Sequence, residues 1–248
     1  MAGHSKSKNI QFRKDRQDAA RSKLFSKFSR DITIAAKAGL PDPAANSRLR
    51  LAIANARAES MPRDNIERAI RKAQGGEADA YEEIRYEGFG PGGAALIVEV
   101  LTDNRNRAAA NVRTVFGKNG GNMGDAGSVA FLFERLGQIA YPPAAGSDEA
   151  VMEAAIEAGA ADVESGEGGH LILTAFEDLA PVADALEGRL GPARSTALIW
   201  KAKSLVPLAE DAGAALERLV DALEEDDDVQ SVWANAEPAE EDAARLAL

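Results

Sequence analysis

Positively charged side chains crowd the start of this 248-residue chain. Of the first thirty residues, nine are Lys or Arg and only two are Asp. We call residues 1–30 the basic arm. Lys and Arg neutralise the phosphates of nucleic acids, so this composition predicts contact with a polyanion. A solvated, frayed terminus is the alternative interpretation, but the scarcity of acids favours phosphate contact. The candidate ligands are His4, Lys6, Lys8, Arg13, Lys14, Arg16, Arg21, Lys23, Lys27 and Arg30.

The charge of the whole chain is divided unevenly along its length. Residues 1–75 hold 17 Lys or Arg against 7 Asp or Glu, residues 76–140 hold 6 against 9, and residues 141–248 hold 6 against 24. The net charges are therefore +10, −3 and −18, and the average of −11 hides a basic N-terminal part. This division predicts that the N-terminal part faces a polyanion and that residues 141–248 face away from it or contact a basic protein.

Composition excludes several classes of chemistry. With 45% hydrophobic residues the chain should bury a core, and without cysteine it has no disulfide, thiolate metal site or cysteine nucleophile. His4 and His170 have no neighbouring set of metal ligands, and no nucleophile, base and acid stand together, so we expect neither a cofactor nor an enzyme. No secretory signal or membrane span is evident, and a cytoplasmic protein is expected.

A second group of cations follows an apolar run at residues 95–103. Asp103 or Asn104 can cap a helix there, yet Arg105 and Arg107 then lie in its first turn, where the helix dipole disfavours positive charge. The two arginines beside free backbone N–H groups could form an anion cradle, or they could form salt bridges with nearby acids. We also assign Arg113 and Lys118, farther along this helix, to the candidate site.

Hydrophobic periodicity predicts three helices in residues 1–75. The first covers 22–38, the second opens with Asp42 as N-cap and Pro43 as first helical residue, and the third follows a break at Met61 and Pro62. A helix-turn-helix must be considered, but no persuasive set of base-reading residues is present. Phosphate contact without base reading is the better interpretation.

Beyond this basic helical domain the pattern alternates between strands and helices. We predict strands at 95–103, 128–134, 137–143, 170–176, 196–204 and 229–237, with a helix after the first, third, fourth and fifth of them and a solvated helix end at 224–228. Two Gly-rich stretches, 87–94 and 117–128, lack the phosphate-binding patterns and are interpreted as tight turns, although Gly120 and Gly121 would let a backbone approach RNA.

The predicted fold class is α+β. A three-helix domain precedes two ferredoxin-like α/β modules, one of which is inserted into the other. The predicted domains are residues 1–75, residues 76–135 together with 206–240, and the inserted residues 136–205.

Several stretches resemble the YebC/PmpR family, which is related to the mitochondrial translational activator of cytochrome oxidase I. They are "MAGHSK", "RQDAARSKLFSKFSRDITIAAK", "MPRDNIERAI", "YEGFGPGGAALIVEVLTDNRNRAAANVR" and "KNGGNMGDAGSVAFLF". Many relatives have a tryptophan where this chain has Ser7 and a histidine where it has Phe12. If that aromatic side chain stacks on a base, this chain relies more on charge.

The resemblance implies three domains and a role in control of gene expression. Some members resemble DNA-binding transcriptional regulators, which is the usual label. Others resemble translation factors that bind the large ribosomal subunit and its RNA and assist synthesis of proline-rich stretches. The weak recognition-helix signal favours RNA, and the family label favours DNA. A third alternative is an acidic scaffold that binds basic proteins. The oligomeric state cannot be predicted from the sequence.

Overall fold

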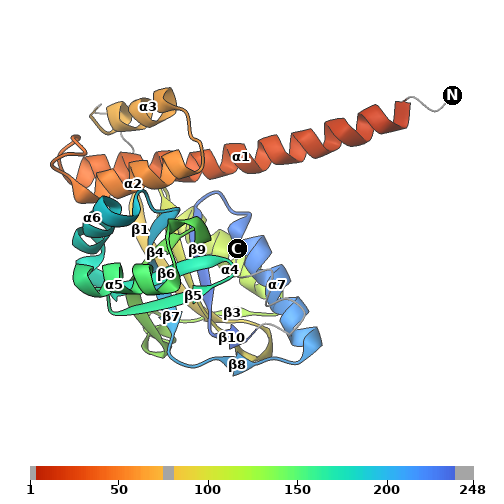
Figure 1. The fold of residues 1–248 in the computed structure, drawn as a ribbon. Coiled ribbons are helices and arrows are strands. Elements are labelled where there is room, and N and C mark those ends of the chain that lie inside the picture. Colours follow the sequence, from red (N-terminus) through yellow and green to blue (C-terminus); the bar gives the residue numbers. More distant parts are fainter. Residues whose placement is uncertain (1–3, 75–80, 238–248) are drawn as a thin grey trace. The chain divides into compact units, whose positions relative to one another are not determined.

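The computed structural model describes residues 4–74 and 81–237, with side chains from residue 21 onward. The chain forms two compact units, Met1–Ala78 and Asp79–Leu248. Unit 1 is helical, and its elements are α1 (His4–Ala38), α2 (Ser47–Ala58) and α3 (Arg63–Gln74). Helix α1 is a single long helix that includes most of the basic arm (Figure 1). The helix predicted to start at residue 22 therefore starts eighteen residues earlier.

The start of α2 differs from the prediction at Asp42 and Pro43. Asp42 accepts a hydrogen bond from the Ala44 amide and forms a turn before the helix. Asn46 is the N-cap instead: its Oδ1 accepts from the Leu49 amide at 3.0 Å, and its Nδ2 donates to the Ala35 carbonyl of α1 at 2.7 Å. Asn46 is preferred because it caps α2 and also satisfies a carbonyl in the last turn of α1.

Three apolar helix faces form the core of unit 1. Ile32 of α1, Leu49 of α2 and Ile66 of α3 are each less than 5% exposed and pack in one cluster. The buried Thr33 hydroxyl lies 2.7 Å from the Ser29 carbonyl and 3.1 Å from the Ala69 carbonyl, so it joins α1 to α3. The predicted break at Met61 and Pro62 is seen, and Met61 is buried against the same cluster.

Unit 2 contains two α/β modules, each built on a four-stranded antiparallel sheet. The sheet of the first α/β module has the order β3-β1-β2-β9, and helices α4 and α7 pack on one of its faces. Its elements are β1 (Glu82–Phe89), β2 (Ala95–Thr102), α4 (Arg105–Lys118), β3 (Asn122–Met123), α7 (Glu210–Glu224) and β9 (Val229–Ala234). This is the strand order of a ferredoxin-like sheet, except that β1 comes from upstream of β2 in the chain.

The second α/β module has the strand order β5-β6-β4-β7, which is the ferredoxin-like order without change. Its elements are β4 (Phe133–Tyr141), α5 (Asp148–Ala158), β5 (Asp162–Gly166), β6 (Gly169–Ala175), α6 (Leu179–Leu190) and β7 (Ser195–Ala202). A short parallel pair, β8 (Val206–Pro207) with β10 (Ala236–Glu237), follows this module. The fold is therefore α+β, with three helices ahead of two ferredoxin-like modules.

The chain returns to the first sheet after completing the second. Strand β9 pairs antiparallel with β2, with Ile97 opposite Trp233, so the second module lies within the sequence of the first. The residue boundaries of the predicted domains stay predictions. In the part of the chain that the structure describes, no helix is both long and apolar enough to cross a membrane.

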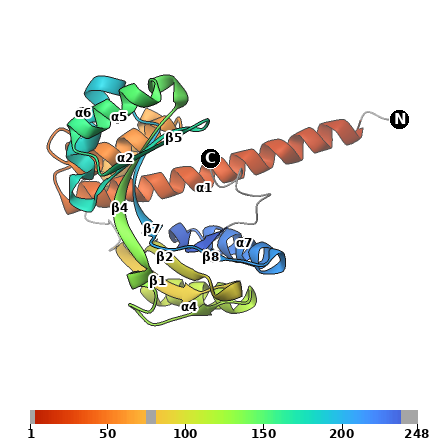
Figure 2. The ribbon, with the colours of Figure 1, turned by 60° about the horizontal axis from the view of Figure 1, so that its bottom comes forward.

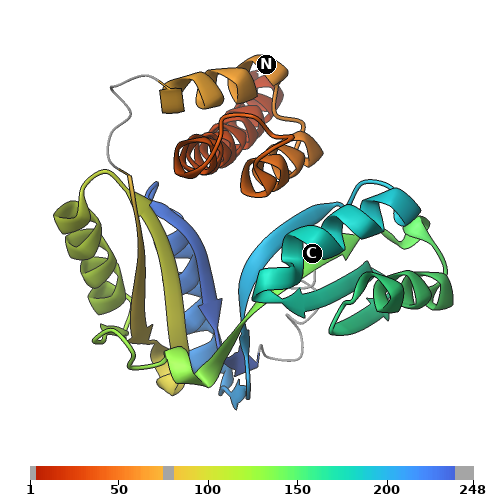
Figure 3. The same ribbon diagram turned by 90° about the vertical axis from the view of Figure 1, so that its left-hand side faces the viewer.

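Strands β4 and β7 connect the two sheets. They run side by side from the first module into the second (Figures 2 and 3). At their common end, Phe133 and Trp200 pack with Ile97 of β2. The Trp200 indole N–H donates to Glu99 Oε1 at 2.9 Å, and the guanidinium carbon of Arg85 lies 4.9 Å from the centre of the Trp200 ring. We call this contact region the joint.

Glu87 of β1 is a carboxylate buried beside the joint. Its side chain is fully buried, and it accepts hydrogen bonds from the backbone N–H groups of Gly127, Val129 and Ala130 at 3.0, 2.8 and 2.9 Å. Arg85 Nε lies 3.1 Å from the same carboxylate. Burial acts to raise the pKa of Glu87, but the three N–H donors and Arg85 outweigh it and hold that pKa below its usual value.

This interaction explains two differences from the predicted strands. The strand predicted at 128–134 is absent, because the amides of Val129 and Ala130 bind Glu87 and cannot join a ladder. Residues 130–132 form a 3-10 turn, and a single strand, β4, replaces the two predicted at 128–134 and 137–143. Strand β1 is missing from the prediction, because its charged residues suggest a linker. Those charges instead bind Trp200 and the 127–130 backbone.

Replacing Glu87 by Gln should destabilise the protein by about 2–3 kcal/mol at pH 7, because a weaker acceptor faces three buried donors. Since the folded-state pKa is lowered, the contribution of the carboxylate is complete above its unfolded-state pKa of about 4.3. It is lost as the pH falls through the folded-state value. Urea unfolding of both proteins between pH 7 and pH 3 measures this. Glu164→Gln, at an exposed ion pair, is the control. A difference in stability that is constant with pH would contradict the prediction.

Candidate nucleic-acid interface

The cations of the basic arm with described side chains lie on α1. Arg21 is exposed, and its guanidinium carbon lies 5.3 Å from the centre of the Phe25 ring. Lys23, Lys27 and Arg30 are partly exposed rather than fully so, and each takes part in a further interaction within the protein. Long cationic side chains can bury their stems and keep the charged group in water, so partial burial is compatible with phosphate contact.

The remaining candidates of the basic arm are placed only by their backbone. Residues 4–20 belong to α1, so these positions lie along the same helix as Lys23 and Lys27. Their side chains lie outside the part of the chain that the structure describes. The positions concerned are His4, Lys6, Lys8, Arg13, Lys14 and Arg16.

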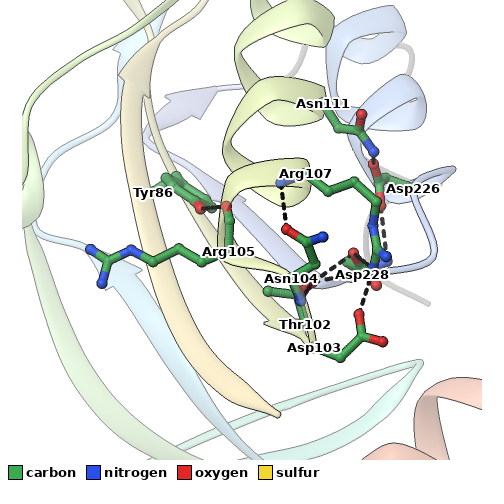
Figure 4. Close-up of polar contacts among 9 residues, drawn as sticks. All are labelled: Tyr86, Thr102, Asp103, Asn104, Arg105, Arg107, Asn111, Asp226 and Asp228. Carbon is green, nitrogen blue, oxygen red and sulfur yellow. Dashed lines mark hydrogen bonds and ion pairs between the residues drawn. The ribbon is translucent and has the colours of Figure 1, made fainter. Parts of the chain in front are cut away.

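The first turn of α4 separates the two arginines that the sequence analysis grouped together. Asn104 is the N-cap, and its Oδ1 accepts from the Arg107 amide at 3.0 Å. Arg107 Nη2 lies 2.8 Å from Asp103 Oδ1 and 2.8 Å from Asp228 Oδ2 (Figure 4). These hydrogen bonds, first that with Asp228, raise the pKa of the Arg107 guanidinium. Of the two predicted alternatives, Arg107 thus forms the salt bridge.

The acidic run at 224–228 supplies the partners for this turn. Asp228 is 6% exposed and also accepts from the Thr102 hydroxyl at 2.9 Å, while Asp226 Oδ2 accepts from Asn111 Nδ2 at 3.0 Å. The prediction of a solvated helix end is therefore wrong for these two residues. They fasten the start of β9 to the end of β2 and to the first turns of α4, which a sequence pattern could not indicate across more than one hundred residues.

Arg105 points away from this cluster and toward β1 (Figure 4). Its backbone carbonyl accepts a hydrogen bond from the Tyr86 hydroxyl at 3.4 Å, and its side chain is exposed. Arg113, two turns later on α4, is also exposed. The positive charges of both guanidinium groups favour the ionised form of the Tyr86 phenol. We call Tyr86, Arg105 and Arg113 the α4 patch.

The electrostatics of Tyr86 reflect this position. Partial burial of its ring against the core raises the pKa of the phenol, Arg105 and Arg113 act to lower it, and Glu82 acts to raise it. The net pKa lies above its usual value, so the hydroxyl is a neutral donor at pH 7. The exposed guanidinium groups of Arg105 and Arg113 can bind phosphate oxygens through charge-assisted hydrogen bonds, whereas the single O–H of Tyr86 already donates to the Arg105 carbonyl. Tyr86 is not among the predicted site residues because β1 was not predicted.

Lys118 and the glycine loops lie apart from the α4 patch. Lys118 is exposed in the last turn of α4, about 20 Å along the helix from Arg105 at 1.5 Å per residue. Gly120 adopts a left-handed φ of 77°, as a tight turn requires. A Cβ at Gly121 would lie 2.8 Å from the Phe89 carbonyl oxygen. Glycine is therefore needed at this position for a close contact within the protein itself.

A basic three-helix domain ahead of two ferredoxin-like modules, one of which has two exposed arginines on its first helix, defines a class of three-domain α+β proteins. The chain belongs to the TACO1/YebC family. Residues 5–76 match the TACO1/YebC protein N-terminal domain, and residues 81–236 match the TACO1/YebC second and third domain. The chain is also similar to a conserved hypothetical protein, Aq1575, from Aquifex aeolicus, with 47% sequence identity and a TM-score of 0.83 to its crystal structure. The match covers 90% of this chain and 93% of that one.

The two arginines of the first α4 turns should differ in their effect on stability. Arg107→Gln should lower the urea midpoint, because it leaves the buried Asp228 carboxylate without its cation. Arg105→Gln is the matched control and should leave the midpoint unchanged, since its guanidinium group is exposed and forms no ion pair among the described residues. Equal midpoints for both variants would contradict the assignment of Arg107 as a structural clamp.

Neutralising Arg105 or Arg113 should raise the pKa of Tyr86 further, because a nearby cation favours the phenolate. The ultraviolet absorbance of tyrosinate measures this during an alkaline titration of Arg105→Gln and Arg113→Gln. The chain has three tyrosines, and burial raises the pKa of Tyr141 to about 12, so a Tyr86→Phe variant identifies the relevant step. An unchanged titration of Tyr86 in both arginine variants would show that the α4 patch is not assembled.

Proposed function

We propose that this protein is a non-enzymatic, nucleic-acid-binding regulator of gene expression. The observation that carries the proposal is the concentration of positive charge in unit 1, where residues 1–75 hold 17 Lys or Arg against 7 Asp or Glu. Helix α1 carries ten of these cations along a single axis. Such a helix can lie against a phosphate backbone and release bound counterions, which makes affinity strongly dependent on salt.

Two targets are compatible with this surface. DNA-binding transcriptional regulation is the role that the family resemblance implies for most bacterial members, and α2 and α3 lie in sequence as a helix-turn-helix would. On α3, however, Arg63 forms an ion pair with Glu67 at 2.7 Å and Asp64 lies in the first turn. Carboxylates at these positions weaken the case for a helix lying between phosphate strands.

Binding to ribosomal RNA, with a role in translation, is the second candidate. The α4 patch favours it, because an exposed arginine pair outside the helical unit suits an irregular phosphate backbone better than a regular duplex groove. The large ribosomal subunit offers many such backbones. On either target, the acidic residues 141–248 would face away from the phosphates or toward a basic protein of the complex.

Cosedimentation with ribosomes at near-physiological salt, with excess duplex DNA as competitor, separates the two targets. We expect retention on the large subunit and its disappearance in a triple variant, Lys23→Glu with Lys27→Glu and Arg30→Glu. The matched control reverses three cations of the acidic part, Arg189, Arg194 and Arg218, and so changes the net charge equally. If the DNA competitor captures the wild-type protein instead, the transcriptional role takes first place.

The salt dependence of binding tests the electrostatic basis of the proposal independently. If about six phosphates are neutralised, the logarithm of affinity for duplex DNA should fall with the logarithm of salt concentration with a slope of roughly −5. The triple variant should have a shallower slope, by about one unit for each phosphate that the variant no longer neutralises. Fluorescence anisotropy with a labelled duplex measures both. An affinity that does not change with salt would refute phosphate binding by α1.

A further inference from the structure

One aromatic side chain of unit 2 lies on the surface, although the residues two positions before and after it in the sequence are buried. Phe131 is 66% exposed, whereas Val129 is fully buried and Phe133 is 3% exposed. Val129 and Phe133 pack in the joint between the two modules. The 130–132 turn between them therefore cannot move Phe131 inward without removing a core residue, and the exposure of Phe131 is a fixed feature of the fold.

The backbone around Phe131 is also held by charged groups. The Glu87 carboxylate binds the amides of Val129 and Ala130, immediately before Phe131. On the other side, the Lys203 ammonium donates to the Phe131 carbonyl at 3.1 Å, and the Lys203 amide donates to the Leu132 carbonyl at 2.9 Å. A single exposed apolar residue needs no explanation, but Phe131 projects from a backbone that is held on both sides, so its position on the surface is preorganised.

The charged group that contacts the Phe131 backbone is positive. Lys203 is exposed, and among the described residues its ammonium group forms no ion pair with a carboxylate. One of its three N–H groups is used by the Phe131 carbonyl, so two can bind an external acceptor. An exposed aromatic side chain with a lysine ammonium group at its own backbone carbonyl suits an unpaired nucleotide: the ring can stack on the base and the cation can bind the phosphate.

We infer that Phe131 and Lys203 form a stacking site for an unpaired nucleobase, with the base on the phenyl ring and its phosphate at the ammonium group. The inference rests on the proposed nucleic-acid function and deepens it, because it names a single-stranded segment as part of the target. A base that is paired within a duplex cannot present its face to Phe131, so the site discriminates single strands and loops from duplexes.

The test uses the full-length protein with an RNA of about 12 nucleotides, a length of roughly one binding site. The RNA carries one 2-aminopurine, whose fluorescence is quenched when it stacks. Phe131→Ala should weaken binding of the single strand roughly tenfold or more and abolish the quenching. Phe131→Leu should behave like Phe131→Ala, since it retains apolar bulk without the aromatic face, and Phe131→Trp should bind like the wild type. The matched control is Ile156→Ala, because Ile156 is an exposed apolar residue of the second α/β module.

The possible outcomes separate the stacking site from its alternatives. Weakened binding in both Phe131→Ala and Phe131→Leu, with duplex RNA binding unchanged in both variants, supports the stacking site. Wild-type affinity and quenching in both variants overturn it, as does wild-type affinity in Phe131→Leu alone, which would make Phe131 an apolar anchor. If the wild type binds neither RNA nor duplex DNA, the proposed function itself fails. Binding that depends on salt but not on Phe131 overturns only this inference. Since the side chain is exposed, urea midpoints of the variants should match the wild type.

Discussion

Strand β2 is buried on both faces, and the architecture of unit 2 follows from that constraint. Leu96, Val98 and Val100 face the helices α4 and α7, while Ala95 and Ile97 pack at the joint. A strand that is apolar on both sides must also have both edges paired, because its backbone groups cannot reach water. Strand β1 covers one edge and β9 covers the other, so the chain returns to the first sheet after completing the second module.

Charged side chains in unit 2 divide according to what lies opposite them. Arg107 has Asp103 and Asp228 at 2.8 Å and serves as a clamp, whereas Arg105, two residues earlier, projects away from them beside Tyr86. Glu87 lies among backbone donors and holds a turn in place. Burying such groups is unfavourable unless each one is fully paired. The pairing of Arg107 with Asp228 holds the first turn of α4, and the pairing of Glu87 with the amides of Val129 and Ala130 holds the backbone before Phe131.

The opposite charges of the two ends of the chain restrict how the protein can engage a polyanion. A basic helix with an acidic region elsewhere on the same chain should orient itself on a phosphate surface, because the helix is attracted to it and the acidic region is repelled. The α4 patch lies on the first module, and Phe131 lies at the joint. In the sequence, both come between the basic arm and the acidic residues 141–248. On the proposed function, several weak contacts of different chemistry would suit an irregular, partly unpaired nucleic acid better than a uniform duplex.

Local patterns were sufficient to predict the helical residues 22–38, the fold class and most of the strands and helices of unit 2, because periodicity can be read within short windows of the chain. They also located Arg105, Arg113 and the helix that carries them. Long-range packing was needed to establish that Asn46 replaces Asp42 as a cap, that 128–134 is not a single strand, and that Arg107 pairs with Asp228. These outcomes depend on groups that meet only in the folded chain, such as Glu87 with Val129, whose pairing no local pattern records.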